Sequence, residues 1–466
     1  MFNFSNGTPE EQTFLRRLKS SVITSLLWNA FESILYQIIY LSHHAALFYT
    51  IDRTLYGTYG ALFAFIYLII MFANMSFEIG VIPFFSIFSE TKQNFRHLVT
   101  HYLLPQAFLL ASIAYALGLF LYNFSYGPRF IIPLLHGWGI LCLVIFVTTE
   151  GMKKNIRALL QLAFQNKKTA WIEIANIFCY VSTVWIAHQS GVPFSLQLLV
   201  VPFIGVSFIT VMVLSLFLYG YYKKLPDGKN TVPHSIKKRI ITNRFFLFIN
   251  QMGNVLFSSN FLLPLFACQT GLQQAGMMTF VNSITFSFTI FIQRVFGPSG
   301  AALFARTKLL SLESKRSAFS FLYRKCWYLV ISLLTLFIVN GKQLLSLKLG
   351  EQPLSLWVVI YIFSLSHVLE TLFLLYDKLF AAEELAHYTA LVNSISFLLC
   401  VSIAFVSSSL MVTLLCCCIV RLITFFCLTL IAHITCGISL PYKLPLKKLL
   451  VPFAVSLIIA VLIKMH

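Results

Sequence analysis

Apolar runs of about 18 or more residues recur along the whole 466-residue chain, and they restrict its fold more than any other feature. A run of that length crosses the hydrocarbon core of a bilayer as a helix. Because lipid offers no water to backbone polar groups, spanning segments must satisfy their own hydrogen bonds, as helices do. We therefore predict an all-α, polytopic membrane protein of about 12–14 spans, placed at 21–49, 58–88, 99–122, 130–150, 170–188, 197–222, 244–267, 275–304, 325–347, 354–380, 385–406, 409–434 and 449–464.

The composition excludes a soluble protein. The chain is 58% hydrophobic and 11% charged, with a mean hydropathy of +0.83. A soluble domain carries about 25% charged residues, so this chain has too few polar side chains to cover a water-soluble body. The net charge of +19 raises the question of a nucleic-acid partner, but no RNA- or DNA-binding motif occurs. We expect no nucleic-acid partner.

The distribution of lysine and arginine explains the charge and predicts the orientation. With the N-terminus inside and the spans alternating, 27 of the 34 basic residues lie in inside segments, five lie outside, and two lie within spans. Such a bias across short loops is the positive-inside rule. We expect a cytosolic N-terminus, with most of the positive charge facing anionic headgroups. Segment 151–169 is basic, and it is predicted to extend the fourth helix as an amphipathic tail with Leu159, Leu160 and Phe164 on one side.

A basic segment at 223–243, rich in turn-forming residues, is predicted to be a cytosolic linker between two halves. It separates an N-terminal six-helix bundle (1–222) from a C-terminal six-helix bundle (244–434). A basic stretch with a further C-terminal span (435–466) follows. Shifting the sequence by 219 residues aligns 56–85 with 275–304 and places Gly57 on Gly276. Two similar halves around a central cavity are a common transporter plan.

Three stretches carry a resemblance to a known family. They are YGTYGALFAFIYLIIMFANMSFEIGVIPFFS (56–86), FLLPLFACQTGLQQAGMMTFVNSI (261–284) and FAAEELAHYTALVNSISFLL (380–399). With the six-plus-six plan, the chain resembles the oligosaccharide flippases of the multidrug/oligosaccharidyl-lipid/polysaccharide (MOP) exporter superfamily, the O-antigen type included. The resemblance implies two six-helix bundles forming a V around a cavity. It also implies alternating access that moves a lipid-linked sugar to the outer leaflet. The extra C-terminal span departs from the twelve-helix form.

Two arginines within spans are candidates for the substrate phosphate. An unpaired guanidinium in hydrocarbon costs at least about 2.5–3.5 kcal/mol on insertion scales, so a chain that retains one pairs it, shields it or uses it. Arginine binds phosphate oxygens with a planar, bidentate fork. Arg294 is the first candidate and Arg421 the second. A structural ion pair is the alternative for both, and snorkelling to the cytosolic face is a further alternative for Arg294.

Acidic residues within spans are the second group of candidates, because intramembrane acids commonly serve ion or proton coupling. Glu32, with Asn29 one turn earlier, is expected to form a polar cavity wall. Glu370 and His367 share a helix face and form a candidate proton-coupling site, with a packing pair as the alternative. The 219-residue shift places Glu78 at the depth of Arg294, and we expect this pair to close a cytosolic gate.

The leading prediction is a transporter that flips a polyprenyl-diphosphate-linked oligosaccharide across a bacterial cytoplasmic membrane for cell-surface polysaccharide synthesis. We expect a monomer that contacts membrane lipids and works with polysaccharide polymerase machinery, and no cofactor or metal. A cation-coupled multidrug exporter and a peptidoglycan-precursor flippase remain alternatives. An integral-membrane polymerase, ligase or glycosyltransferase is disfavoured, because the outer loops are short and no nucleotide or metal motif occurs.

Overall fold

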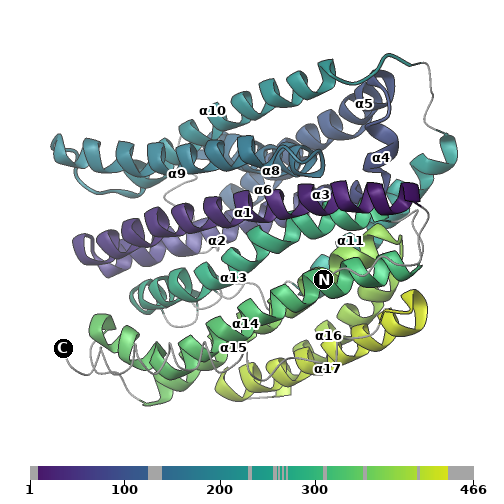
Figure 1. The fold of residues 1–466 in the computed structure, drawn as a ribbon. Coiled ribbons are helices and arrows are strands. Elements are labelled where there is room, and N and C mark those ends of the chain that lie inside the picture. Colours follow the sequence, from purple (N-terminus) through teal and green to yellow (C-terminus); the bar gives the residue numbers. More distant parts are fainter. Residues whose placement is uncertain are drawn as a thin grey trace.

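The computed structural model describes residues 9–123, 139–228, 233–254, 271–307, 312–349, 354–406 and 410–438, with a few positions between 260 and 268. These residues form helices and connecting turns. Long helices run side by side in two groups (Figure 1). The first group contains α1 (Pro9–Thr50), α2 (Arg53–Asn74), α6 (Leu104–Asn123), α8 (Gly139–Leu162), α9 (Asn166–Gln189) and α10 (Leu196–Lys223). The second contains α11 (His234–Asn254), α13 (Leu272–Thr307), α14 (Leu312–Leu349), α15 (Leu354–Ala382), α16 (Ala386–Val406) and α17 (Leu410–Cys436).

The second predicted span is interrupted instead of continuous. After α2, Met75 and Ser76 adopt left-handed backbone conformations, with φ of 45° and 54°. Three short elements follow: α3 (Phe77–Gly80), a 3₁₀ turn (Ile82–Phe84) that contains Pro83, and α4 (Phe85–Phe88). A left-handed residue ends the α-helical hydrogen-bond ladder, and proline lacks the N–H needed to continue it. The third span is likewise assembled from α5 (Lys92–Leu98), a π-helical turn (Val99–Leu103) and α6.

The fourth helix extends well past its predicted end at residue 150. Helix α8 runs to Leu162, so the predicted amphipathic tail is part of it, and Leu159 and Leu160 are buried. Phe164, which was expected on the same helix face, instead lies in the following turn with a φ of 56°. The predicted linker is also shorter, because α11 already begins at His234, immediately after Pro233.

The two groups meet mainly where α13 packs against α1 and α2. Near the N-terminal ends of α2 and α13, a Cβ added to Gly57 would overlap the carbonyl oxygen of Leu272, and one added to Gly276 would overlap the carbonyl oxygen of Arg53. The two glycines therefore permit backbone-to-backbone contact, as small residues do between membrane helices. Gly57 and Gly276 are 219 positions apart, as are Arg53 and Leu272, and this is the offset of the sequence alignment, so the contact is reciprocal.

Seven of the described helices are long and apolar enough to cross a membrane. They lie at Ser20–Thr50, Arg53–Asn74, Lys92–Tyr122, Asn166–Gln189, Leu196–Lys223, Ala386–Ile403 and Leu415–Cys436. Many of their large apolar side chains point outward, including Phe108 at 74% and Leu216 at 70% exposure. An apolar exterior of this kind suits a lipid environment. The chain is a multi-pass membrane protein. The predicted span 449–464 lies outside the described residues.

Candidate functional site

Two connected cavities lie between the helix groups and share four lining residues. The first, the outer cavity, has a volume of about 350 Å³ and is bounded by α1, α2, α8, α9, α10 and α13. The second, the inner cavity, has a volume of about 290 Å³ and is bounded by α3, the 3₁₀ turn, α8, α13 and α15. Under the predicted orientation, the inner cavity is nearer the cytosol. The shared residues at the junction are Lys154, Arg157, Gln293 and Arg294.

A buried carboxylate joins two arginines at this junction. Glu32 on α1 is fully buried, and its Oε1 accepts hydrogen bonds from Arg157 Nη2 at 2.5 Å and Arg294 Nη1 at 3.0 Å. Arg157 belongs to α8 and Arg294 to α13, so one carboxylate oxygen ties the N-terminal group to the C-terminal group. Glu173 on α9 lies 3.5 Å from Arg157 Nη1. Burial strengthens such charge interactions, but it also makes any charge left without a partner costly.

An aromatic ring and unused polar atoms complete the junction. The guanidinium of Arg294 stacks on the Tyr36 ring, with its Cζ 3.7 Å from the ring centroid. Such cation–π contact holds the guanidinium plane in one orientation. Glu32 Oε2 and Arg157 Nε are buried and have no hydrogen-bond partner. The junction therefore retains both acceptor and donor capacity that its internal ion pairs do not use.

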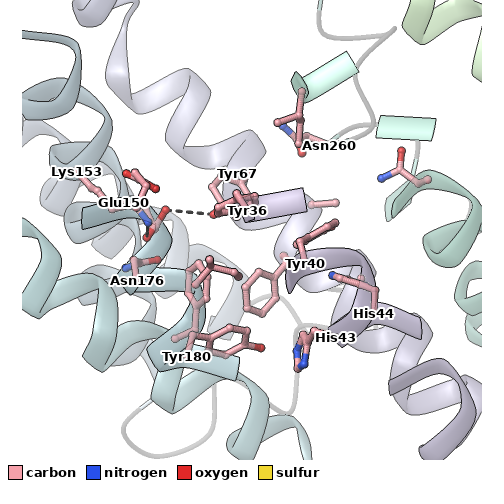
Figure 2. A pocket seen from close by; sticks show the side chains of 18 of the residues that line it. Tyr36, Tyr40, His43, His44, Tyr67, Glu150, Lys153, Asn176, Tyr180 and Asn260 are labelled. Carbon is pink, nitrogen blue, oxygen red and sulfur yellow. Dashed lines mark hydrogen bonds and ion pairs between the residues drawn. The ribbon is translucent and has the colours of Figure 1, made fainter. Parts of the chain in front are cut away.

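A second polar cluster lines the outer cavity one to two turns away along α8. Glu150 Oε1 accepts hydrogen bonds from Lys153 Nζ and Ser207 Oγ, both at 2.5 Å. Glu150 Oε2 accepts a hydrogen bond from Tyr67 at 3.1 Å, drawn as a dashed line in Figure 2. This cluster is internally neutralised, and Glu32 and Glu173 balance the two arginines, so the unmatched positive charge of the outer cavity comes from Lys154.

The role of α8 in the site was not predicted. Lys153, Lys154 and Arg157 were expected in the amphipathic tail at 151–169 and were counted toward the positive-inside bias. In the structure Lys153 is 8% exposed and Arg157 lines both cavities. A signal was available, since Glu150, Lys153, Lys154, Arg157 and Gln161 recur at intervals of three and four residues and so share one helix face.

Three of the predicted cavity residues line neither cavity: Glu32 is fully buried in the ion pairs of the junction, and Asn29 and Arg421 lie in helix contacts. Asn29 is 1% exposed and donates a hydrogen bond to Ser299 Oγ at 3.1 Å, so it fastens α1 to α13 and does not line either cavity. Arg421 is 1% exposed, donates to Asn254 Oδ1 at 2.5 Å and lies 5.1 Å from the Phe373 ring centroid. Both cases agree with a structural role, because each side chain is buried and donates a hydrogen bond to another helix.

The predicted gate pair is brought near the inner cavity but is not formed. Glu78 and Arg294 both line that cavity. The carboxylate that Arg294 contacts is Glu32, because α1 and not α3 packs along this part of α13. Lys378 of α15 lines the same wall as Glu78. Glu370 and His367 both lie in α15, one turn apart, but their side chains are outside the described part of the structure.

A different residue connects the two groups at the helix break. Arg244 of α11 donates hydrogen bonds to Gln106 Oε1 at 2.6 Å and to the Met75 carbonyl at 3.4 Å, and it covers the Phe77 ring. A Cβ at Gly80 would overlap the Arg244 side chain, so the glycine leaves room for it. The interruption of the second span thus exposes a backbone acceptor that the other group uses.

No family model matches this chain, and no curated protein matches its sequence. Solved structures do match. One is described as the outward-facing conformation of a multidrug resistance MATE family transporter of the MOP superfamily. It has a TM-score of 0.63 and 12% identity, with 96% of this chain and 97% of that chain covered. A MOP superfamily transporter from Pyrococcus furiosus, described as having a binding pocket of reversed polarity that suggests a different function, has a TM-score of 0.66. Its sequence identity is 10%, and the match covers 90% of this chain and 96% of that chain.

A structure of MATE in complex with Br-NRF is also similar, at a TM-score of 0.61 and 12% identity, with 90% of this chain and 97% of that chain covered. At this level of identity the likeness concerns the fold. This chain is an all-helical, multi-pass membrane protein with two helix groups around a central cavity. Its fold is similar to that of the MOP superfamily transporters, which is the fold that the sequence resemblance implied.

Proposed function

We propose that the protein is a transporter that moves a polyprenyl-diphosphate-linked oligosaccharide across a membrane by alternating access. One observation carries the proposal: Arg157 and Arg294, from opposite helix groups, converge on a single buried carboxylate between two cavities. Planar guanidinium groups bind phosphate oxygens through paired, charge-assisted hydrogen bonds. A diphosphate fits this pair of arginines better than a cation does.

Glu32 has a specific part in this proposal. Its Oε1 occupies the position between the two guanidiniums that a phosphate oxygen would take. Substrate phosphate therefore competes with Glu32 for Arg294, and binding loosens the tie between α1 and α13. A ligand shifts a conformational equilibrium only by its differential affinity for the two states, and the exchange of carboxylate for phosphate supplies such a difference.

The remaining features of the proposal follow from the fold and from the charge distribution. Its shared fold with MOP superfamily transporters supports a transporter over an enzyme. The positive-inside bias supports a cytosolic N-terminus in a bacterial cytoplasmic membrane. In that location, an oligosaccharide flippase would act as a monomer among membrane lipids and deliver its product to polysaccharide polymerase machinery outside.

The test is reconstitution into vesicles that contain a fluorescent polyprenyl-diphosphate-linked sugar, with its arrival in the opposite leaflet followed by an impermeant quencher. Arg294→Ala and Arg157→Ala should each reduce the rate by at least about tenfold, since a charged hydrogen bond contributes about 1.5–3 kcal/mol. Lys92→Ala serves as the control, because Lys92 pairs with exposed Asp227 away from both cavities. Equal rates in wild type and both arginine variants would refute the phosphate role.

A multidrug exporter is the second candidate, and Glu150 and Glu173 favour it because both carboxylates line the outer cavity. Acids in a cavity attract cationic drugs. Efflux of a cationic dye that is lost in Glu173→Gln, with no movement of the lipid-linked sugar, would identify the protein as an exporter. Movement of the sugar without dye efflux would exclude it.

A further inference from the structure

The outer cavity ends in a group of aromatic and imidazole side chains that the arginine junction does not involve. Figure 2 shows Tyr40, His43, His44 and Tyr180 around this end of the cavity, on α1 and α9. His43 and His44 are only 2% and 4% exposed. The Tyr40 and His44 rings lie 4.2 Å apart, and the His43 and Tyr180 rings 5.3 Å apart. The four rings therefore form a continuous aromatic surface at the outer end, called the ring end below.

One ring nitrogen of His43, Nε2, has no hydrogen-bond partner in the protein. Trp185 Nε1 donates a hydrogen bond to His43 Nδ1 at 3.1 Å. Because an indole nitrogen is a donor only, Nδ1 must accept and carry no proton. In the neutral ring the proton then resides on Nε2, which makes Nε2 a donor. Nε2 is buried and has no hydrogen-bond partner, while His43 lines the cavity. A buried donor of this kind costs about 1–3 kcal/mol when it remains unsatisfied.

His44 is held in a similar fixed arrangement. Its Nδ1 lies 2.7 Å from the Tyr56 hydroxyl. Beside the two histidines, the hydroxyl groups of Tyr59 and Tyr180 lie 3.3 Å apart. Hydroxyl groups both donate and accept. The ring end therefore presents one committed donor, His43 Nε2–H, beside hydroxyls that can adapt to a ligand.

The ring end differs in charge from the junction and lies a fixed distance from it. The lining residues gathered here, including Tyr40, His43, His44, Tyr59 and Tyr180, are not acids or permanent cations. Eleven residues of α1 separate Glu32 from His43, which corresponds to about 16 Å along the helix. A ligand that spans the cavity would therefore place an anionic group at the arginines and a neutral, hydroxyl-rich group at the rings.

We propose that the ring end is a sugar subsite in which His43 Nε2–H donates to a ligand hydroxyl while the aromatic faces of Tyr40 and Tyr180 pack against the sugar ring. This rests on the proposed function and specifies which part of that substrate the outer cavity recognises. A neutral sugar satisfies the buried donor without introducing charge, and its C–H faces suit the negative faces of aromatic rings. The subsite would give the transporter a preference for a glycosylated lipid over the bare carrier.

The experiment measures equilibrium binding to the full-length protein in nanodiscs with two probes. One probe is a polyprenyl diphosphate without sugar, and the other is the same lipid with an attached neutral trisaccharide. Wild type should bind the trisaccharide probe more tightly. His43→Phe keeps the ring but removes the donor, and it should reduce that preference by about fivefold, the order expected for one hydrogen bond. Affinity for the bare diphosphate should change by less than about twofold.

Two further variants separate the donor from a packing effect. His43→Gln retains an N–H near the Nε2 position and should recover part of the preference. Trp185→Phe leaves His43 in place but releases its Nδ1, so the proton is no longer confined to Nε2 and the preference should fall. His188→Phe is the matched control, because His188 contacts Trp185 at 6.1 Å between ring centroids and does not line the cavity.

The outcomes distinguish the subsite from the function on which it rests. Binding of the bare diphosphate that depends on Arg294, with no added affinity for the trisaccharide probe, would overturn the subsite and leave the proposed function standing. A trisaccharide preference that is unchanged in both His43→Phe and Trp185→Phe would also overturn it. Binding of neither probe would overturn the proposed function, and the subsite would fall with it.

Discussion

Replacing Glu32 with glutamine keeps the size of the side chain but removes the negative charge that lies between two guanidinium groups. Arg157 and Arg294 lie 2.5 and 3.0 Å from its Oε1. At an effective dielectric constant of about 20, two unit charges about 4 Å apart interact by about 4 kcal/mol, and removing one partner from a buried ion pair costs about 3–5 kcal/mol. The arginine side chains remain 15% and 18% exposed, and Glu173 stays near Arg157. We therefore adopt the lower end, about 3 kcal/mol.

This value predicts two measurable changes. Unfolding entropy of about 2.1 cal/mol/K per residue converts 3 kcal/mol into a Tm decrease of about 3 °C for the Glu32→Gln variant. Removing the competing charge should also strengthen binding of a polyprenyl diphosphate by about tenfold, because a neutral amide holds the arginines more weakly than a carboxylate does and phosphate displaces it more easily. The ligand-induced increase in Tm should accordingly be larger in the variant than in wild type.

Differential scanning fluorimetry in detergent, with and without the polyprenyl diphosphate, measures both changes. Glu90→Gln is the control, since Glu90 is an exposed carboxylate outside the junction. Weaker diphosphate binding in Glu32→Gln would refute the competition, because it would mean that the carboxylate organises the arginines for the ligand and does not occupy its place. An unchanged Tm would refute the magnitude assigned to the ion pairs.

Three other predictions test two helix contacts and one helix cap. Gly276→Ala should lower Tm, because the added methyl group would overlap a backbone carbonyl of α2 and cost about 1–3 kcal/mol of stability. Gly205→Ala should leave Tm unchanged in the same thermal unfolding experiment, because Gly205 has open space around it. Arg244→Ala should lose about 1.5–3 kcal/mol from its charged hydrogen bonds between the helix groups, and an unchanged Tm would contradict this. Hydrogen bonds from Thr54 lower the pKa of Asp52. The stabilising contribution of the Asp52 carboxylate is therefore complete above the ordinary carboxyl pKa, and it is lost as the pH falls through the lowered pKa. The Asp52→Asn variant should lack this acid-dependent decrease in Tm.

Apolar run length predicted most of the helices, because the requirement to satisfy backbone hydrogen bonds in lipid leaves few alternatives. The predictions were wrong where local backbone chemistry intervened. The span at 58–88 is broken at Met75 and Ser76, and the tail predicted to extend the fourth helix over 151–169 ends at Leu162. Charged residues there appeared too polar for a span, yet they are buried because carboxylates on neighbouring helices neutralise them.

The candidate site could be predicted only in part. Arg294 and Glu32 stand out in the sequence because each is an isolated charge in an apolar run. Their pairing with each other could not be predicted, since it depends on α1 packing against α13 across 262 positions of sequence. The part of Arg157 in the site could not be predicted for the same reason: the face of α8 that it occupies becomes a cavity wall only when α13 lies opposite. The orphaned donor of His43 likewise depends on Trp185, 142 positions away.

The sequence by itself thus determined the class of the protein, the approximate positions of most of its helices, and the 219-residue relation between its halves. These properties depend on apolar length and local periodicity, which are written along the chain. Only the tertiary structure decided which charges meet, which carboxylate lies between Arg157 and Arg294, and which polar atoms remain open to a ligand. Those properties depend on contacts between distant helices, where burial turns a modest charge interaction in water into a strong one.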